Sequence, residues 1–168
     1  MLRLVTFNAS TTYKGIKAFD CGNEMINTFV QKSLKKRVKK HLSQAYVLLN
    51  EKENFVGFYT LDTFSINKEI FELPNKPSAL PPIVPVVKLN MLGIDKTLQG
   101  QGIGKRLLKD ALLKVVNISK IAGCVGMYLT AEKDTVVFYE KLGFVALNNA
   151  EPLPMFLHIE KILEGVAG

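Results

Sequence analysis

A glycine-rich turn between an apolar segment and a helix constrains this sequence most. The run Gln99-Gly100-Gln101-Gly102-Ile103-Gly104-Lys105-Arg106 follows a β-rich stretch and opens an amphipathic helix. Its alternating glycines leave the backbone uncovered by side chains. The helix that begins there points its free N–H groups and the positive end of its dipole into the turn. The turn is therefore predicted to hold an anion, most naturally a pyrophosphate, although a loose turn before a helix is the simpler interpretation.

Two better-known glycine motifs do not fit this turn. A Walker loop requires a glycine where Gln99 stands and a serine or threonine where Arg106 stands. A dinucleotide-binding fingerprint has the spacing G-x-G-x-x-G, whereas this chain has G-x-G-x-G. The sequence therefore indicates neither a P-loop NTPase nor a Rossmann dehydrogenase.

Length and composition indicate one globular domain over residues 1–168, with 48% hydrophobic residues. No apolar run reaches the ~20 residues of a membrane span. The first residues resemble a strand and not a signal peptide, so we expect a cytoplasmic protein. Cys21 and Cys124 have no metal-ligand spacing and are expected to be free thiols, with no metal bound. Cys21 lies near a predicted helix start, where a thiolate is favoured, but a structural role is the simpler interpretation.

The positive charge of the chain is concentrated in one segment. The formal net charge is +7, and the stretch between Met25 and Asn50 contains basic residues and no acidic residue. A localised basic surface favours an anionic partner such as nucleic acid, although a lysine-rich helix face is often merely solvated. We expect RNA contacts from the exposed face of a helix, at Lys32, Lys35, Lys36 and Lys39.

Strand and helix patterns alternate along the chain, which predicts an α/β fold. A helix is expected from the cap residues near Asp20 to about Lys40, with Ile26, Val30, Leu34 and Val38 on its inner face. Prolines forbid regular structure through most of Asn67 to Pro85. The other predicted helices are Ile103 to Val116 and Glu132 to Lys141, and the predicted strands are Met1 to Phe7, Ala45 to Leu49, Phe55 to Ile66, Val86 to Ile94, Gly123 to Leu129, Phe144 to Leu147 and Met155 to Ile159.

Two motifs together resemble the GNAT superfamily of N-acetyltransferases. Gln99, Gly102 and Gly104 match its Q/R-x-x-G-x-G/A loop, and the run Phe138 to Phe144 (FYEKLGF) resembles its second hallmark downstream. The resemblance implies a single domain with a mixed, mostly antiparallel sheet, splayed between its fourth and fifth strands and flanked by helices. It also implies acetyl-CoA as the cosubstrate, gripped at its pyrophosphate by the glycine loop.

The same resemblance implies a set of site residues. Backbone N–H groups at the end of the fourth strand would point at the thioester carbonyl, where negative charge develops. Tyr139 would be the general acid that protonates the leaving thiolate, unless it merely packs its helix. The residues implied to bind acetyl-CoA are Leu92, Gly93, Ile94, Gln99, Gly100, Gln101, Gly102, Ile103, Gly104, Lys105 and Phe138.

No general base stands out from the sequence. His41 and His158 are isolated, and the spacing of Asp95 and Glu132 supports neither. At pH 7 a lysine amine is neutral only about once in 2,500, whereas an α-amine is neutral roughly a tenth of the time. A site without a base is therefore better matched to an α-amine acceptor.

One GNAT subfamily resembles nearly the whole chain: the toxins of bacterial toxin–antitoxin pairs that acetylate the α-amine of aminoacyl-tRNA. Its F-x-C-G motif matches Phe19 to Gly22, and its basic first helices match Lys32 to Lys40. Its L-x-V-D-x-x-x-Q-G-Q-G run resembles the segment that begins at Leu92. The usual Gly-Arg is Asn90-Met91 here, which removes one basic group near the acceptor. The resemblance implies charged tRNA as substrate and a cognate antitoxin as partner.

Other interpretations remain open at this point. The same enzyme with a small-molecule amine, a protein N-terminus or a lysine as acceptor is one alternative. A catalytically silent domain that binds CoA or a protein is another, and Tyr139 with the intact glycine loop argues against it. The oligomeric state, a homodimer included, does not follow from the sequence.

Overall fold

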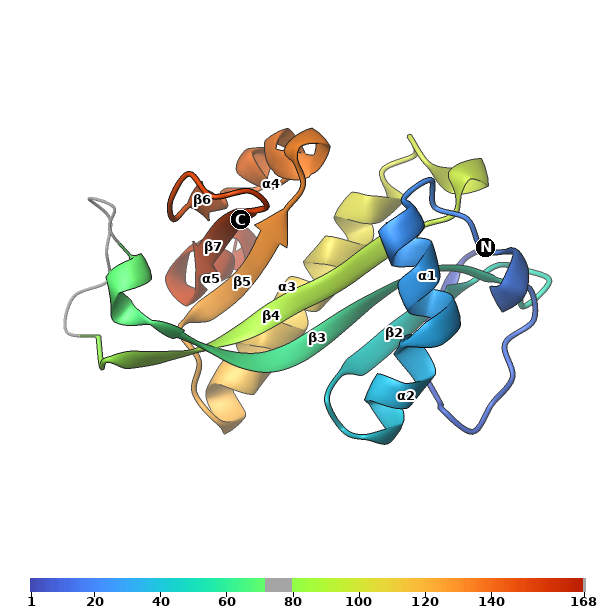
Figure 1. The fold of residues 1–168 in the computed structure, drawn as a ribbon, viewed down its shortest axis with the longest axis horizontal. Helices are drawn as coiled ribbons and strands as arrows, with labels where there is room; N and C mark the ends of the chain where they lie inside the picture. Colours follow the sequence, from blue (N-terminus) through green and yellow to red (C-terminus); the bar gives the residue numbers. More distant parts are fainter. Residues whose placement is uncertain (72–79, 168) are drawn as a thin grey trace. The chain divides into compact units, whose positions relative to one another are not determined.

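The structure, a computed structural model, describes residues 1–71 and 80–167 (Figure 1). Over this range the strands join in the order β1-β2-β3-β4-β5-β7-β6. The β4–β5 pair is parallel, whereas the β1–β2, β2–β3, β5–β7 and β6–β7 pairs are antiparallel. The strands are β1 (Arg3–Thr6), β2 (Gln44–Leu49), β3 (Phe55–Asn67), β4 (Ile83–Ile94), β5 (Gly126–Ala131), β6 (Val145–Ala146) and β7 (Leu153–His158).

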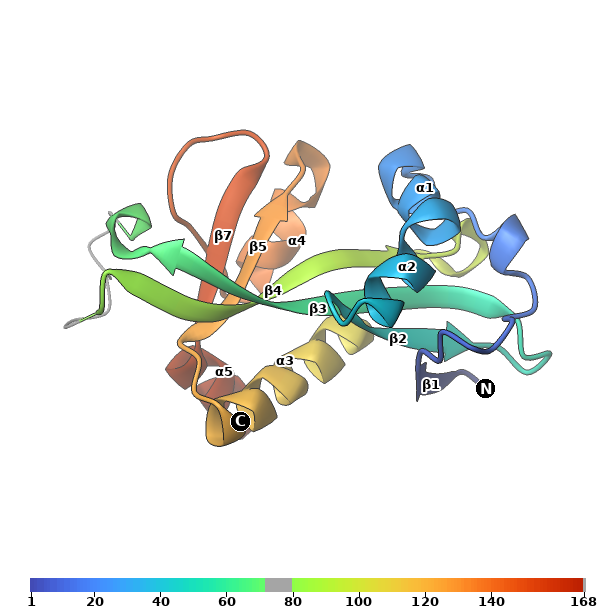
Figure 2. The same cartoon turned by 60° about the horizontal axis from the view of Figure 1, so that its bottom comes forward.

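The chain divides into two compact units. The elements β3, β4 and α3 (Ile103–Ile121), labelled in Figure 2, each contribute residues to both units. The first unit comprises Met1–Asp62 and Asn90–Ala111, and the second comprises Thr63–Leu89 and Leu112–Gly168. The remaining elements of the first unit are η1 (Ile16–Ala18), α1 (Glu24–Lys32), α2 (Leu34–Lys39) and η3 (Lys96–Leu98). Those of the second are η2 (Lys68–Ile70), η4 (Lys133–Thr135), α4 (Val136–Lys141) and α5 (Ile159–Ala167).

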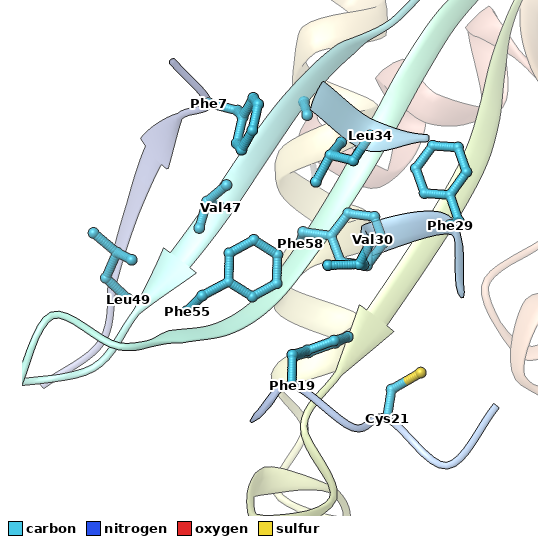
Figure 3. Close-up of a cluster of buried hydrophobic side chains, with 11 residues drawn as sticks. Phe7, Phe19, Cys21, Phe29, Val30, Leu34, Val47, Leu49, Phe55 and Phe58 are labelled. Carbon is cyan, nitrogen blue, oxygen red and sulfur yellow. The ribbon is translucent and has the colours of Figure 1, made fainter. Parts of the chain in front are cut away.

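Aromatic side chains build the core of the first unit beneath α1 and α2 (Figure 3). The Phe19 ring meets Phe55 edge-on at 5.1 Å, and Phe29 stacks on Phe58 at 6.2 Å. Val30 and Leu34 are buried in this core, and Ile26 and Val38 pack against it, as the four-residue spacing predicted. The buried phenylalanine of the F-x-C-G motif therefore anchors that segment to the sheet.

The predicted single helix up to Lys40 is wrong, because the chain forms two helices that break at Ser33. Ser33 has a φ of −120°, outside the helical range, although its N–H still donates to Phe29 O at 2.8 Å. Its own carbonyl accepts the N–H of Arg37 at 2.9 Å, which starts α2. Lysines three and four residues apart repel one another on a continuous helix, which favours a break within this charged run.

The second unit contains the short parallel ladder at which the sheet was predicted to splay. β4 and β5 pair only through Val87–Met127 and Lys88–Tyr128, whereas β5 pairs with β7 along its whole length. Helix α5 was not predicted. It begins directly after β7, and its Ile162 is buried.

The proline-rich segment from Asn67 to Pro85 is more ordered at its ends than predicted. β3 extends through Asn67, η2 follows, and β4 begins at Ile83. The predicted irregular positions Pro74 and Pro77 lie outside the described residues. Among the described helices, none is long and apolar enough to cross a membrane.

Gly93 is predicted to be required for the close packing of α1 against β4. A Cβ at this position would lie 3.0 Å from Cγ2 of Ile26 and 3.2 Å from Cε1 of Phe58. We expect Gly93→Ala to lower the free energy of unfolding by about 1–3 kcal/mol through overpacking. Thermal and urea unfolding measure this change. The control Gly165→Ala adds a Cβ that meets nothing within 4 Å, so a comparable loss there would contradict the explanation.

Candidate functional site

The glycine loop has the backbone geometry that an anion cradle requires. Gly100 and Gly102 have φ values of +79° and +77°, which residues with a side chain rarely adopt. A Cβ at either position would meet nothing within 4 Å, so the space beside the loop is open. Helix α3 then begins, with Arg106 N–H donating to Gly102 O at 3.2 Å. The first-turn N–H groups before Arg106 have no acceptor within the helix, so they fit a diphosphate ligand.

The side chain of Gln99, although the residue is exposed, bridges two neighbouring segments and fixes the start of this loop. Its Nε2 donates to the carbonyl oxygen of Cys21 at 2.7 Å and to that of Ile94 at 2.9 Å. One amide group therefore joins the end of β4 to the segment before α1. Gln99 thus acts as a positioning residue, and the sequence motif alone gave no signal of this role.

Asp20 fastens the same two segments from the other side. Its carboxylate accepts hydrogen bonds from Gly22 N–H and Asn27 Nδ2 and forms an ion pair with Lys96 Nζ, each at 2.9 Å. The Lys96 N–H donates to Asp20 O, also at 2.9 Å. The contact with Lys96 is the main reason that the pKa of Asp20 falls to about 2. These contacts therefore hold the F-x-C-G segment against the residues that precede the glycine loop.

The surroundings of both cysteines favour a structural role over a reactive one. Cys21 is buried, and burial raises the pKa of its thiol. Burial likewise raises the pKa of the Cys124 thiol. Both thiols are free, as predicted. The raised pKa of Cys21 disfavours the reactive thiolate that its place near a helix start allowed.

The direction of the β4 backbone distinguishes the predicted N–H donors. Met91 N–H donates to Thr60 Oγ1 at 3.1 Å, and Asp95 N–H donates to Val56 O at 2.9 Å, so both face β3. Because successive residues of a strand point their N–H groups to opposite edges, Gly93 also faces β3. Leu92 and Ile94 therefore direct their N–H groups to the other edge of β4. These two groups are the ones available to a ligand.

Tyr139 lies in α4, in the second unit, within an aromatic cluster. Its ring meets Phe138 edge-on at 5.1 Å and Phe144 at 5.5 Å. Gly143, with a φ of +97°, turns the chain after the helix, so that Phe144 N–H donates to Tyr139 O at 3.2 Å. Burial raises the pKa of Tyr139 to about 12. Its hydroxyl is protonated at neutral pH, as it would be at its ordinary pKa of ~10, and the raised pKa makes the phenol a weaker acid.

The basic segment consists of exposed lysines and one paired arginine. Lys32, Lys35, Lys36 and Lys39 are all exposed, as is Lys40. Arg37, which lies in the same basic run, turns inward: its Nη2 lies 3.0 Å from Oδ2 of the buried Asp62, and its Nε donates to Ser43 Oγ at 2.9 Å. The predicted RNA face therefore consists of lysines, while Arg37 holds α2 on the sheet.

Of the four side chains considered as general bases, Asp95 and His158 form hydrogen bonds. Asp95 accepts hydrogen bonds from Asp20 N–H and from Thr97, and His158 Nδ1 accepts the N–H of Glu160 at 3.1 Å. Burial acts to raise the pKa of Asp95, but these hydrogen bonds outweigh it and lower the pKa. His41 is exposed in the turn after α2, and Glu132 precedes η4.

Comparison with known proteins shows which protein family this chain resembles. Residues 41–146 match the model of the GNAT acetyltransferase domain. The chain is 30% identical over 157 residues to a probable toxin TacT of Sinorhizobium fredii, which covers 86% of this chain and 85% of that protein.

Solved structures give the same result. A bacterial toxin matches with a TM-score of 0.94 and 33% identity, over 99% of this chain and 96% of that one. The toxin AtaT in complex with acetyl-methionyl-tRNAfMet matches with a TM-score of 0.88 and 26% identity over 100% of both chains. A Tyr-to-Phe mutant of AtaT, bound to the C-terminus of the antitoxin AtaR and to acetyl-CoA, matches at 0.84 and 27% over 99% of both.

The bridging role of Gln99 is testable through stability. We expect Gln99→Glu to lower the unfolding free energy by about 1–3 kcal/mol, because two hydrogen bonds are lost and a carboxylate would face two carbonyl oxygens in place of a donor. Thermal unfolding measures the loss. The matched control Gln101→Glu introduces the same charge at an exposed position in the same loop and should change stability by less than about 0.5 kcal/mol. Equal effects of the two substitutions would show that charge, and not the bridge, matters.

Proposed function

Since the chain belongs to the GNAT family of acetyltransferases, we propose that it transfers the acetyl group of acetyl-CoA to the α-amine of aminoacyl-tRNA. The observation that carries this proposal is the likeness, along the whole length of both chains, to a toxin solved with acetyl-methionyl-tRNAfMet. The exposed lysines of α1 and α2 support it, because they offer positive charge to a phosphate backbone. The relative solved with an antitoxin segment supports a cognate antitoxin as the second partner.

The glycine loop is proposed to bind acetyl-CoA through its pyrophosphate. Gly100 and Gly102 allow the close approach, and the first-turn N–H groups of Ile103, Gly104 and Lys105 would donate to phosphate oxygens. Gln99 contributes its backbone only, since its side-chain amide is engaged by the carbonyl oxygens of Cys21 and Ile94. The positive end of α3 adds an electrostatic attraction for the diphosphate.

The N–H groups of Leu92 and Ile94 are proposed to hold the acetyl carbonyl oxygen. When the amine attacks, a C–N bond forms, and negative charge develops on that oxygen. Donors already directed at this position stabilise the charge without reorganisation. The charge then returns as the C–S bond breaks, the attacking nitrogen loses a proton to solvent, and Tyr139 donates one to the leaving thiolate.

An α-amine suits the proton chemistry of this chain. The residues weighed as bases have structural partners or lie exposed, so we assign none of them to deprotonate the acceptor. An α-amine has an appreciable neutral fraction at pH 7 without help, whereas a lysine side chain does not. This difference favours aminoacyl-tRNA over a protein lysine as the acceptor.

Binding of acetyl-CoA is tested by adding bulk to the first turn of α3. We expect Gly104→Val to raise the dissociation constant of acetyl-CoA strongly, because the side chain would occupy the space beside the N–H groups. Calorimetric titration measures the constant, and thermal unfolding checks that the variant is folded. Gly165→Val, at the other helical glycine in α5, serves as the control and should leave the constant unchanged. Unchanged affinity in folded Gly104→Val contradicts the cradle.

The role of Tyr139 is tested by removing its hydroxyl alone. We expect Tyr139→Phe to bind acetyl-CoA nearly normally and to turn over about 10²–10⁴ times more slowly, the usual contribution of a general acid. Single-turnover acetyl transfer measures the rate. Tyr13→Phe removes a phenol hydroxyl in the first unit and should retain normal turnover. Wild-type turnover in Tyr139→Phe would assign the protonation to another group or to solvent.

The RNA face is tested by charge reversal. We expect the replacement of Lys32, Lys35, Lys36 and Lys39 by Glu to abolish action on charged tRNA while acetyl-CoA binding is retained. Wild-type tRNA affinity should fall steeply with salt, because phosphate contacts release counterions. A matched variant reverses four other exposed lysines, namely Lys52, Lys109, Lys120 and Lys133. If both variants lose tRNA binding equally, net charge alone drives it, and the proposed face is excluded.

A further inference from the structure

An open groove of about 690 Å³ lies within the second unit, apart from the residues assigned above. The last residues of β3, the start of β4, the middle of β5 and the loop before β7 line it. Among its described lining residues are Phe64, Asn67, Glu69, Ile83, Tyr128 and Asn148. The groove therefore combines aromatic, aliphatic and amide side chains in one place.

Phe64 forms an exposed aromatic platform in this groove. Its ring stacks on Tyr128 with the centroids 5.5 Å apart and the planes inclined by 11°. Tyr128 is 8% exposed, whereas Phe64 is 41% exposed. Burial therefore secures one side of the stack, while much of the Phe64 ring faces solvent. An aromatic ring held in this way suits a planar, apolar partner.

A cation and several polar groups stand around the platform. The Lys88 ammonium lies over the Phe64 ring, 4.9 Å from its centroid, so a base that stacks on this ring would move the ammonium aside. Asn67 and Asn148 are exposed, and each side-chain amide offers a donor and an acceptor. Glu69, also exposed, offers acceptors only. An aliphatic ligand could form no hydrogen bond or ion pair with these groups. A nucleotide can stack its base on the ring, form hydrogen bonds through the base edge and place its phosphate near the cation.

We propose that this groove binds an unpaired nucleobase of the RNA acceptor, stacked on Phe64, with an adjoining phosphate at Lys88. This inference rests on the proposed function and adds a specific contact to it. Lys88 and Leu92 belong to the same strand, β4, four residues apart.

The contact can be observed directly, because the chain contains no tryptophan. Phe64→Trp introduces a single tryptophan on the platform, and its fluorescence can be excited selectively over that of the tyrosines. We expect saturable quenching when it is titrated with an RNA hairpin that ends in unpaired 3′ nucleotides, and none with the same hairpin ending bluntly. Ile121→Trp, at a position 85% exposed at the end of α3, is the control and should respond to neither RNA. Equal quenching by the blunt hairpin, or none by either, overturns the proposal.

A second measurement uses affinity. Phe64→Leu keeps an apolar side chain but removes the ring, and it should weaken binding of the hairpin with unpaired nucleotides by about 5- to 100-fold, as expected for one stacked base. Phe64→Tyr should bind normally. Unchanged affinity in folded Phe64→Leu overturns the proposal, as does quenching of Phe64→Trp by an apolar amino-acid amide or a peptide but not by RNA.

Transfer to charged tRNA by the wild-type enzyme separates the two proposals. If transfer occurs but neither Phe64 variant responds to unpaired RNA, the groove inference alone fails. If no transfer occurs yet the unpaired RNA still quenches Phe64→Trp, the proposed acceptor is wrong while the groove remains an RNA-binding site.

Discussion

The two hydrogen bonds from the Gln99 amide are the constraint on which the first unit's site depends. They join carbonyl oxygens of the F-x-C-G segment and of the end of β4. The ion pair between Lys96 and Asp20 closes the same junction from the other side. With the junction held, the loop can present uncovered backbone at Gly100 and Gly102, and α3 can begin at a defined place. A ligand-binding loop that contains several glycines needs such contacts to hold it in one conformation, because glycine has the most flexible backbone.

Local chemistry was enough to predict much of this chain. The glycine loop, the β2–β3 hairpin and the buried face of α1 and α2 follow from spacing that acts over a few residues. The bridging role of Gln99 did not follow, because its partner Cys21 is 78 residues away. The inward contact of Arg37 likewise did not follow, because its partner Asp62 is 25 residues away. Helix α5 was missed because it starts without a turn residue, where His158 accepts the N–H of Glu160 in place of a usual cap.

Some parts of the candidate site could likewise be predicted from local sequence motifs, whereas others depend on contacts between distant segments. Sequence motifs pointed to the loop and to Tyr139, but not to the distinction among Leu92, Gly93 and Ile94. That distinction depends on which edge of β4 each N–H faces, and it required the bonds from Met91 to Thr60 and from Asp95 to Val56. The groove beside Phe64 had no signal in the sequence, since its lining comes from four separate segments.

We propose that this acetyltransferase modifies the α-amine of charged tRNA. Labelled acetyl-CoA, incubated with the protein and total charged tRNA beside a panel of small amines and proteins, tests it most directly. Mass spectrometry of the products released from the tRNA ester locates the label. We expect N-acetylated aminoacyl groups on charged tRNA and no label on uncharged tRNA. Label on small amines or on protein lysines, with none on charged tRNA, would contradict it.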